Sequence, residues 1–279
     1  MFNLYGVEGS TNVQGERVKK LDVIANEAFI TALSRSTTVS VMVSEENENI
    51  ICVKESQGDY ICVFDPLDGS SNIDANVSIG SIYGIYRRDK DLTDEKAVLK
   101  PGTELVAAGY TLYGSATVLV LGMQGEKPNG FTLDPSTGEF VLTHASVSMP
   151  ESHPIYSINE GNTRSWDTHV KKYVQELKEG PKSYSLRYVG SMVADVHRTL
   201  TYGGIFLYPE DSKSGAGKLR LLYEANPLAL LIEGAGGKAI TGRGNRILEI
   251  VPTSPHQRTG VVLGSKGEVE KYETYLKDK

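Results

Sequence analysis

The feature that most constrains the fold of this chain is an apolar run at 60–64 that leads directly into the polar string DPLDGSS at 65–71. The proline fixes the backbone just after the first carboxylate, so the expected turn lets the two aspartates and the carbonyl between them face one point. The glycine permits close approach of a ligand, and the two serines offer N–H groups and hydroxyls at an expected helix start. The string therefore predicts a cation site that abuts an anion site, as a phosphate ester bound to a metal requires. The groups concerned are Asp65, the Leu67 carbonyl, Asp68, Gly69, Ser70 and Ser71.

Two further acidic clusters follow apolar strands. Glu45 and Glu46 come after the alternating valines of residues 39–43, and Glu224 follows an expected strand at 219–223. Two carboxylates about 4 Å apart repel by roughly 4 kcal/mol at an effective dielectric of about 20, so a larger group stays ionised only with cations among it. Oxygen ligands without histidine or thiolate favour Mg²⁺ or Mn²⁺ over zinc. Together, the three clusters predict a site for hard divalent cations.

Length and periodicity predict a layered protein of mixed strands and helices. The 279 residues are enough for one large domain or two modest ones, and the composition changes only near Pro150. We therefore expect a metal-motif domain over 1–150, beginning with a mobile loop over 1–15, and a second domain over 151–279. Apolar residues at helical spacing predict helices, and alternation predicts strands. The expected helices cover 18–33, 166–177, 191–200 and a segment from Pro227, and the expected strands cover 39–43, 60–64, 79–86, two segments within 105–125, 155–158, 204–208 and 219–223.

Charge and cysteine usage exclude several classes of protein. Lys and Arg number 29 against 35 Asp and Glu, a net charge of −6, which argues against nonspecific nucleic-acid binding. Cys52 and Cys62 are too few for a disulfide framework or a cysteine zinc site, and are expected as reduced thiols in apolar strands. No signal peptide is visible, so we expect a cytoplasmic protein without membrane or nucleic-acid partners.

The polar string, with Ser44-Glu45-Glu46 upstream, resembles the metal motif of the lithium-sensitive, metal-dependent phosphomonoesterase superfamily. Within that group, the chain is similar to class I fructose-1,6-bisphosphatases over nearly its whole length. The stretch GKLRLLYEANP at 217–227 matches that family's signature and is specific by itself. The resemblance implies the layered α-β-α-β-α sugar phosphatase fold of the α+β class, with mixed sheets between helix layers. The other matching stretches are GSTNV at 9–13, KKLDV at 19–23, RYVGSMVADVHR at 187–198 and GGIFLYP at 203–209.

The resemblance also implies a role for each matching residue. Asp22 would lie on the mobile loop that closes over the site and, with Glu46, would help activate the attacking water. Arg187 would reach in from a neighbouring subunit, and Met192 would lie against the sugar ring. The implied ligands of Mg²⁺, with Mn²⁺ possible, are Glu45, Glu46, Asp65, the Leu67 carbonyl, Asp68 and Glu224. The implied 1-phosphate site is Gly69, Ser70 and Ser71, and the implied site for the 6-phosphate and sugar is Asn159, Tyr188, Tyr208 and Lys218.

The implied activity is hydrolysis of the 1-phosphate of D-fructose 1,6-bisphosphate to fructose 6-phosphate and phosphate, in gluconeogenesis, by a homotetramer. Asn162 stands where many relatives carry a 6-phosphate tyrosine, so we expect weaker substrate binding rather than another substrate. Two alternatives stay open: a sedoheptulose-1,7-bisphosphatase, or a catalytically silent sugar-phosphate sensor. The presence of all five metal carboxylates and of Asp22 argues against silence.

Class I relatives bind AMP as an allosteric inhibitor, and the resemblance implies only a degenerate AMP site here. Relatives carry an N-terminal helical segment ahead of the loop that begins here near Leu4. That segment supplies much of their AMP site, and we expect this chain to lack it. Tyr60 and Arg87 match positions that contact the nucleotide, whereas Asp59 stands where relatives place a phosphate-binding lysine. Because an anion beside a phosphate replaces attraction with repulsion, we expect insensitivity to AMP.

Three other sequence features suggest a functional site, but each is better explained by a structural role. The Trp166-Asp167 pair mimics a motif of inositol-phosphatase relatives, but its expected position within a helix predicts a core tryptophan. His197 has no metal-ligand spacing to the other histidines and is expected to be structural. The glycines at 234–237 follow a helix rather than a strand, so they are not a dinucleotide-binding motif.

Overall fold

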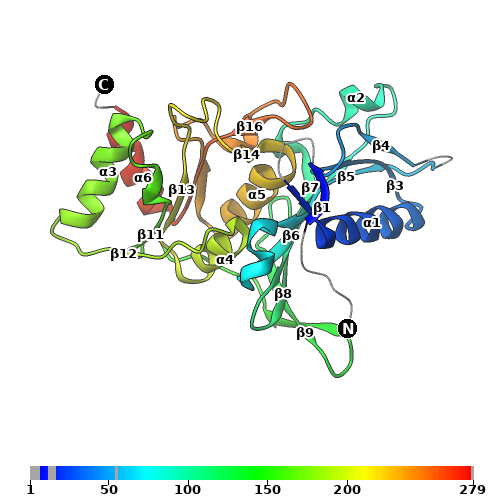
Figure 1. Ribbon diagram of the computed structural model, residues 1–279, viewed down its shortest axis with the longest axis horizontal. Helices are drawn as coiled ribbons and strands as arrows, with labels where there is room; N and C mark the ends of the chain where they lie inside the picture. Colours follow the sequence, from blue (N-terminus) through cyan, green and yellow to red (C-terminus); the bar gives the residue numbers. More distant parts are fainter. Residues whose placement is uncertain (1–6, 12–16, 54–55, 278–279) are drawn as a thin grey trace.

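The computed structural model describes residues 7–11, 17–53 and 56–277. Its helices and sheets form five layers, which Figure 1 shows from left to right as two helices, a sheet, two helices, a second sheet and one helix. The layered mix of helices and mixed sheets expected for the chain is therefore confirmed.

The larger sheet has eight strands in the order β10-β9-β8-β7-β6-β5-β3-β4. Only β3 and β5 pair in parallel, and the rest of the sheet is antiparallel. Helix α1 (Lys20–Arg35) covers one face, where Phe29 stacks on Phe64 with ring centroids 4.8 Å apart. The strands are β3 (Val39–Ser44), β4 (Ile51–Cys52), β5 (Tyr60–Asp68), β6 (Ile79–Arg87), β7 (Leu105–Tyr113), β8 (Thr117–Met123), β9 (Asn129–Asp134) and β10 (Glu139–His144).

Strand β5 continues four residues beyond the end that the sequence predicts. Asp65 pairs with Ile82 and Asp68 pairs with Gly80, so three steps along β5 correspond to two along β6. Pro66 has no N–H to donate to the ladder, and this bulge accommodates it without ending the strand. The bulge leaves the two aspartates at the end of a buried central strand. Gly69 follows with φ of +81°, a conformation that favours glycine, and the 3₁₀ helix η1 (Ser70–Ala75) begins at the expected position.

The smaller sheet has five strands in the order β12-β11-β13-β17-β15, and it mixes parallel and antiparallel pairs. Helices α3 (Thr168–Glu179) and α6 (Lys266–Leu276) cover its outer face. Helices α4 (Met192–Tyr202) and α5 (Asn226–Gly234) lie between the two sheets and contact both (Figure 1). The strands are β11 (Ile155–Ser157), β12 (Ser185–Leu186), β13 (Ile205–Tyr208), β15 (Lys238–Ile240) and β17 (Val261–Gly264).

The largest hydrophobic cluster draws side chains from both halves of the chain. Val41 and Ile82 of the larger sheet share it with Phe206 of the smaller sheet and Leu228 of α5, all at most 1% exposed. A second cluster lies between the smaller sheet and helices α3 and α6, and a third lies under α1. Because the central cluster joins the sheets, the ends of β5 and β13 keep a defined separation.

Two expectations near the N-terminus differ from the structure. Val7–Thr11 forms strand β1 where the sequence predicts a loop, and it pairs with β2 (Arg17–Lys19). Residues 1–6 and 12–16 lie outside the described part of the chain. The helix expected from residue 18 begins at Lys20, because Val18 belongs to β2. Asp22 is therefore the third residue of α1, where it accepts the Lys19 N–H at 2.8 Å, and not a loop residue.

Two expectations in the second half also differ. Trp166 precedes α3, pairs by its backbone with Asp211, and is a core residue as expected at 5% exposure. The strand expected at 219–223 is only β14 (Leu219–Arg220), which pairs with β16 (Arg258–Thr259) and leads into a π-helical turn, η4 (Leu221–Ala225). A short apolar run does not distinguish a buried strand from a buried helix, which explains the error.

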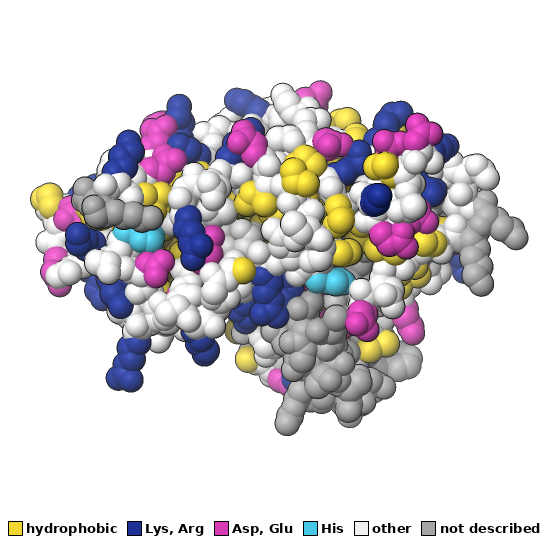
Figure 2. All heavy atoms as spheres, turned by 90° about the horizontal axis from the view of Figure 1, so that it is seen from above, with side chains coloured by type: hydrophobic (Ala, Val, Ile, Leu, Met, Phe, Trp, Pro, Cys, Tyr) yellow, Lys and Arg dark blue, Asp and Glu magenta, His cyan; other side chains and the backbone are white. Residues whose placement is uncertain are grey.

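The remaining short helices lie in connections. They are α2 (Asp94–Ala97), η2 (Gly102–Glu104), η3 (Glu160–Asn162) and η5 (Ile247–Glu249). Both cysteines are free: Cys62 is buried in β5, whereas Cys52 is exposed at the sheet edge and donates from Sγ to Asp94 at 3.2 Å. On the face seen in Figure 2, acidic and basic side chains are intermixed rather than segregated by sign.

Candidate active site

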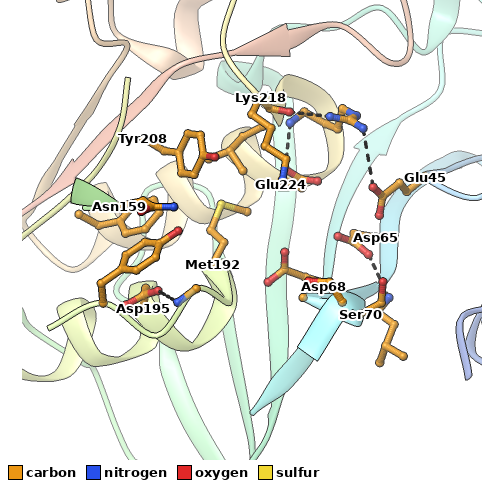
Figure 3. A pocket seen from close by; sticks show the side chains of 18 residues that line it. Glu45, Asp65, Asp68, Ser70, Asn159, Met192, Asp195, Tyr208, Lys218 and Glu224 are labelled. Carbon is orange, nitrogen blue, oxygen red and sulfur yellow. Dashed lines mark hydrogen bonds and ion pairs between the residues drawn. The ribbon is translucent and has the colours of Figure 1, made fainter. Parts of the chain in front are cut away.

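A cavity of about 210 Å³ opens where the carboxyl ends of β3 and β5 meet α4, β13 and η4. Figure 3 shows Glu45, Asp65 and Asp68 on one side, Asn159, Tyr208 and Asp195 on the other, and Met192 between them. The structure therefore gathers most of the predicted site residues around one cavity. Those lining it are Glu45, Asp65, Leu67, Asp68, Gly69, Ser70, Ser71, Asn159, Tyr188, Met192, Tyr208, Lys218 and Glu224.

Three carboxylates converge on the acidic side of the cavity. One oxygen from each of Glu45, Asp65 and Glu224 lies within 4.8 Å of the others. Burial and the charges of neighbouring carboxylates raise the pKa values of Asp65 and Glu224 well above their usual values. Burial also raises the pKa of Asp68 to about 7, against the lowering effect of a backbone hydrogen bond. The cluster thus holds more negative charge than its protein surroundings neutralise.

Hydrogen bonds fix the orientation of these carboxylates. Asp65 Oδ1 accepts the Leu67 N–H at 2.9 Å, across the bulge in β5. Asp68 Oδ2 accepts the Val193 N–H at 2.7 Å, and Glu224 Oε2 accepts the Arg220 N–H at 2.9 Å. Each of these bonds occupies one carboxylate oxygen, and the second oxygen of Asp65 lies toward Glu45.

The donor set of the cluster fits a hard divalent cation. All its ligand atoms are carboxylate oxygens, which Mg²⁺ and Mn²⁺ prefer, and the described residues bring no histidine or thiolate into the group. Arg220 Nη2 lies 4.0 Å from Glu45 Oε1 and is too distant to neutralise the whole cluster. A bound cation would relieve the repulsion that raises the pKa values.

The turn at Gly69, which the sequence predicts to bind phosphate, lies directly beside the acidic cluster. A Cβ on Gly69 would meet Ser191 Oγ at 2.7 Å, so glycine is required for space as well as for its positive φ. The turn is tied to the opposite wall of the cavity by Asn72 Nδ2, which donates to the Gly190 carbonyl at 3.0 Å. Ser70 and Ser71 follow at the start of η1 and line the cavity.

The opposite wall carries neutral donors, one cation and the buried carboxylate of Asp195. Asn159 lies at the end of β11, Tyr208 ends β13, and Lys218 precedes β14. Burial and the neighbouring Tyr208 raise the pKa of Tyr188 to about 12, so its hydroxyl keeps its proton at neutral pH. Such a wall suits a sugar phosphate whose phosphate is recognised but not cleaved.

Asp195 supports this wall, and the sequence interpretation did not assign it a role. It is fully buried on α4, accepts the N–H groups of Val189 and Gly190 at 3.0 Å, and pairs with Arg198 Nη1 at 2.8 Å. It thereby holds the turn after Tyr188. Arg220, which the structure buries, was also missed, although its place within the matching stretch at 217–227 was a signal available in the sequence.

Three predicted site residues do not line this cavity. Asp22 is buried in the first turn of α1, and Glu46 follows Glu45 in the turn after β3. Arg187 is exposed, and its Nη1 donates to the Leu186 carbonyl at 3.1 Å. The predicted roles of Asp22 and Glu46 therefore require a movement of α1 and the turn after β3. The predicted role of Arg187 requires another subunit.

The residues of the expected degenerate AMP site lie together at the ends of β5 and β6. Tyr60 and Arg87 are register partners, and the Arg87 guanidinium lies 5.7 Å from the centre of the Tyr60 ring. Asp59 pairs with Lys90 at 2.6 Å. In the part of the chain that the structure describes, no helix is long and apolar enough to cross a membrane.

Comparison with known proteins agrees with this arrangement. The profile of the fructose-1,6-bisphosphatase N-terminal domain matches residues 1–145, and that of the C-terminal domain matches residues 149–277. The chain is 56% identical to the cytosolic fructose-1,6-bisphosphatase of Brassica napus over 275 residues, which cover 97% of this chain and 80% of that protein. The cytosolic enzyme of Arabidopsis thaliana is also 56% identical, with the same coverage. A crystal structure of Leishmania major fructose-1,6-bisphosphatase in holo form superposes with a TM-score of 0.94 at 50% identity, covering 99% of this chain and 86% of that one. The chain therefore belongs to the fructose-1,6-bisphosphatase family.

Proposed function

We propose that this enzyme is a metal-dependent phosphatase that hydrolyses the 1-phosphate of D-fructose 1,6-bisphosphate to fructose 6-phosphate and inorganic phosphate, a step of gluconeogenesis. The observation that carries the proposal is the two-sided cavity, in which carboxylates and the turn at Gly69 face a wall that carries neutral donors and Lys218. The names of the relatives, which are similar over nearly the whole chain, support the same activity.

Different residues of the cavity bind the two ends of the substrate. Gly69, Ser70 and Ser71 hold the 1-phosphate at the end of β5, where backbone N–H groups at the start of η1 favour an anion. Asn159, Tyr188, Tyr208 and Lys218 hold the 6-phosphate and sugar, and Met192 lies against the ring. This two-ended grip orients the ester bond toward the carboxylates.

The chemical step is attack of water on the phosphorus atom of the 1-phosphate. The new P–O bond forms as the bond from phosphorus to the oxygen on C1 breaks, and that oxygen leaves on the sugar and is protonated. Asp22 and Glu46 accept the proton of the attacking water once α1 and the adjoining turn approach the cavity. This movement would bring the start of α1, which carries Asp22, and the turn after β3, which carries Glu46, over the active site.

The proposed cofactor is Mg²⁺, with Mn²⁺ as a substitute. Glu45, Glu46, Asp65, Asp68, Glu224 and the Leu67 carbonyl would hold it. When bound, the cation would neutralise negative charge on the transferred phosphoryl group and on the leaving oxygen. The convergence of three carboxylate oxygens within 4.8 Å supports this assignment for part of the set.

The proposed assembly is a homotetramer in which Arg187 completes the 6-phosphate site of a neighbouring subunit. The exposure of Arg187 and its position outside the cavity of its own chain support this assignment. We also propose that residues 1–150 form the metal-motif domain and residues 151–279 the sugar-phosphate domain. The cytoplasm is the proposed location, because the names of the plant relatives include the word cytosolic.

The decisive experiment measures phosphate release from fructose 1,6-bisphosphate and from sedoheptulose 1,7-bisphosphate, each with and without Mg²⁺. We expect Mg²⁺-dependent release, with a higher kcat/KM for the fructose ester. A higher kcat/KM for the sedoheptulose ester would favour the alternative bisphosphatase. Absence of turnover on both would favour a sugar-phosphate sensor.

A further inference from the structure

A series of hydrogen bonds runs from the carboxylate cluster to the protein surface, through the partly buried side chain of His256. Tyr223, next to Glu224 in η4, is fully buried, and its hydroxyl lies 3.0 Å from Nδ1 of His256. Nε2 of His256 lies 3.1 Å from the carbonyl oxygen of Glu48. Glu48 belongs to the turn after β3 that carries Glu45. The imidazole therefore bridges two segments that are far apart in the sequence and that each carry a carboxylate of the cluster.

The carbonyl of Glu48, at one end of this series of hydrogen bonds, decides the direction of both bonds. A backbone carbonyl can only accept, so Nε2 of His256 carries the proton and donates it to Glu48. The lone pair of Nδ1 then accepts the hydroxyl proton of Tyr223. Burial lowers the pKa of His256, so the imidazole stays neutral at neutral pH, as the two bonds require.

The segment that carries His256 is itself attached to the start of η4. Strand β16 pairs with β14, and the Leu221 N–H donates to the Gln257 carbonyl at 2.8 Å. The imidazole is thus fixed relative to Glu224. Its other end reaches the turn of Glu45, which is also linked to this side by the 4.0 Å approach of Arg220 to Glu45.

We propose that His256, through Tyr223 and Glu48, is a positioning residue for the divalent-cation site, an inference that rests on the proposed metal-dependent function. The carboxylates of Glu45 and Glu224 repel each other without a cation, and this repulsion tends to separate their segments. The bridge holds the segments together, so the ligands need less rearrangement when the cation binds. Both ring nitrogens of His256 are engaged in the bridge, so His256 itself is not a ligand. Groups that orient metal ligands in this way typically contribute about 10-fold to 100-fold in metal affinity.

The chain offers a matched control in a second tyrosine–histidine pair. The hydroxyl of Tyr110, also fully buried, lies 2.7 Å from Nδ1 of His197. Ring centroids are 5.8 Å apart in both pairs, and both pairs are edge-to-face. The control pair joins β7 to α4, neither of which carries a carboxylate of the cluster. Loss of a hydrogen bond from a buried tyrosine to a histidine should therefore lower the stability of both Tyr223→Phe and Tyr110→Phe. A change in the affinity for metal, by contrast, should appear only in Tyr223→Phe.

The test compares Tyr223→Phe, His256→Ala, His256→Gln and Tyr110→Phe in the full chain saturated with fructose 6-phosphate. Mn²⁺ is titrated in, free Mn²⁺ is followed by electron paramagnetic resonance, and the Mg²⁺-induced shift in Tm is recorded separately. We expect Tyr223→Phe and His256→Ala to raise the Kd for Mn²⁺ by about 10-fold or more. His256→Gln should recover part of the affinity, because its amide can still donate to Glu48. Tyr110→Phe should lower Tm but leave the Kd within about twofold of that of the unsubstituted chain.

Two results would overturn the inference. One is a Kd for Mn²⁺ in Tyr223→Phe and His256→Ala that stays within about twofold of that of the unsubstituted chain. The other is an equal loss of affinity in Tyr110→Phe. If the unsubstituted chain itself shows neither Mn²⁺ binding nor a Mg²⁺-induced shift in Tm, the proposed function fails, and this inference fails with it.

Discussion

Asp68 Oδ2 accepts the backbone N–H of Val193 at 2.7 Å, so one carboxylate of the acidic cluster also holds the first turn of α4. That turn carries Met192, which lies between the acidic side of the cavity and the side formed by Asn159 and Tyr208 (Figure 3). The hydrogen bond therefore fixes the distance between the proposed cation site and the proposed sugar site. It also decides which substitution tests Asp68 cleanly, because alanine would leave a buried N–H without its acceptor.

Asp68→Asn should remove catalysis but not stability. The amide oxygen can still accept the Val193 N–H, while one buried negative charge disappears. We expect kcat to fall by about 100-fold or more. In EDTA, Tm should equal or exceed that of the unsubstituted chain, because repulsion with Glu45 is relieved. Thermal unfolding followed by circular dichroism, together with phosphate release, measures both quantities.

Glu45→Gln should behave in the same way. Asp134→Asn, at the end of β9 and outside the lining of the cavity, should leave kcat unchanged. A fall in Tm of more than about 4 °C for Asp68→Asn without metal would show that the carboxylate stabilises the fold instead.

The metal-free protein should lose stability as the pH rises through about 7. Burial raises the pKa of Asp68 to about 7, and the pKa values of Asp65 and Glu224 are also raised. A carboxyl group whose pKa is higher in the folded state than in the unfolded state stabilises the fold while protonated, and this stability disappears as it ionises. In EDTA, Tm should therefore be lower at pH 8 than at pH 6.

Mg²⁺ should reverse this trend, because the cation binds the ionised carboxylates. Asp68→Asn should show a shallower dependence of Tm on pH in EDTA. A metal-free Tm that rises between pH 6 and pH 8 would contradict the prediction.

Mixing Arg187→Ala subunits with Asp68→Asn subunits should restore activity. In such a hybrid, the Arg187→Ala subunit keeps Asp68 in its own site, and its Asp68→Asn neighbour supplies Arg187 to that site. Some sites of the hybrid are therefore complete. Co-expressed, differently tagged chains purified as hybrids should be more active than either parent, measured as kcat per site. No gain in the hybrids would reject a site shared between subunits, as would a fully active monomer in sedimentation at assay concentration.

Asn162→Tyr should strengthen substrate binding. Asn162 lines a small cavity of about 10 Å³ together with Asn159 and Tyr208, beside the proposed 6-phosphate site. A phenolic hydroxyl at this position adds a donor for the phosphate that is not cleaved. We expect KM to fall about threefold to tenfold with little change in kcat, since binding gained equally in the ground and transition states changes KM alone. Thr163→Tyr, on the exposed next residue, should leave KM unchanged, and an unchanged KM in Asn162→Tyr would place the 6-phosphate elsewhere.

AMP should not inhibit the enzyme at micromolar concentration. Asp59 presents a carboxylate where a phosphate would need a cation, and its ion pair with Lys90 at 2.6 Å also occupies that nearby cation. Arg87 remains beside Tyr60 and offers the nucleotide only part of a site. Titration of AMP into the bisphosphatase assay at saturating Mg²⁺ measures the effect. Half-inhibition at micromolar AMP, relieved by substitution of Tyr60 or Arg87, would contradict the prediction.

The sequence by itself determined the family, the layered class of fold and the residue types of the site. These depend on local patterns: an apolar strand followed by DPLDGSS, a proline at the start of α5, and alternating valines before Glu45. Such patterns act over a few residues, where backbone geometry and hydrophobic periodicity decide the outcome. They therefore predicted the start of η1 and the strands β7 and β8 correctly.

Only the tertiary structure decided how these local features meet. The bulge in β5, the π-helical turn at 221–225 and the helical position of Asp22 all depend on packing between elements rather than on neighbours in the chain. The approach of Glu45, Asp65 and Glu224 to within 4.8 Å, and the bridge from Tyr223 through His256 to Glu48, join segments that are distant in sequence. Burial in the shared core is what holds such carboxylates close together despite their repulsion, and no local pattern encodes it.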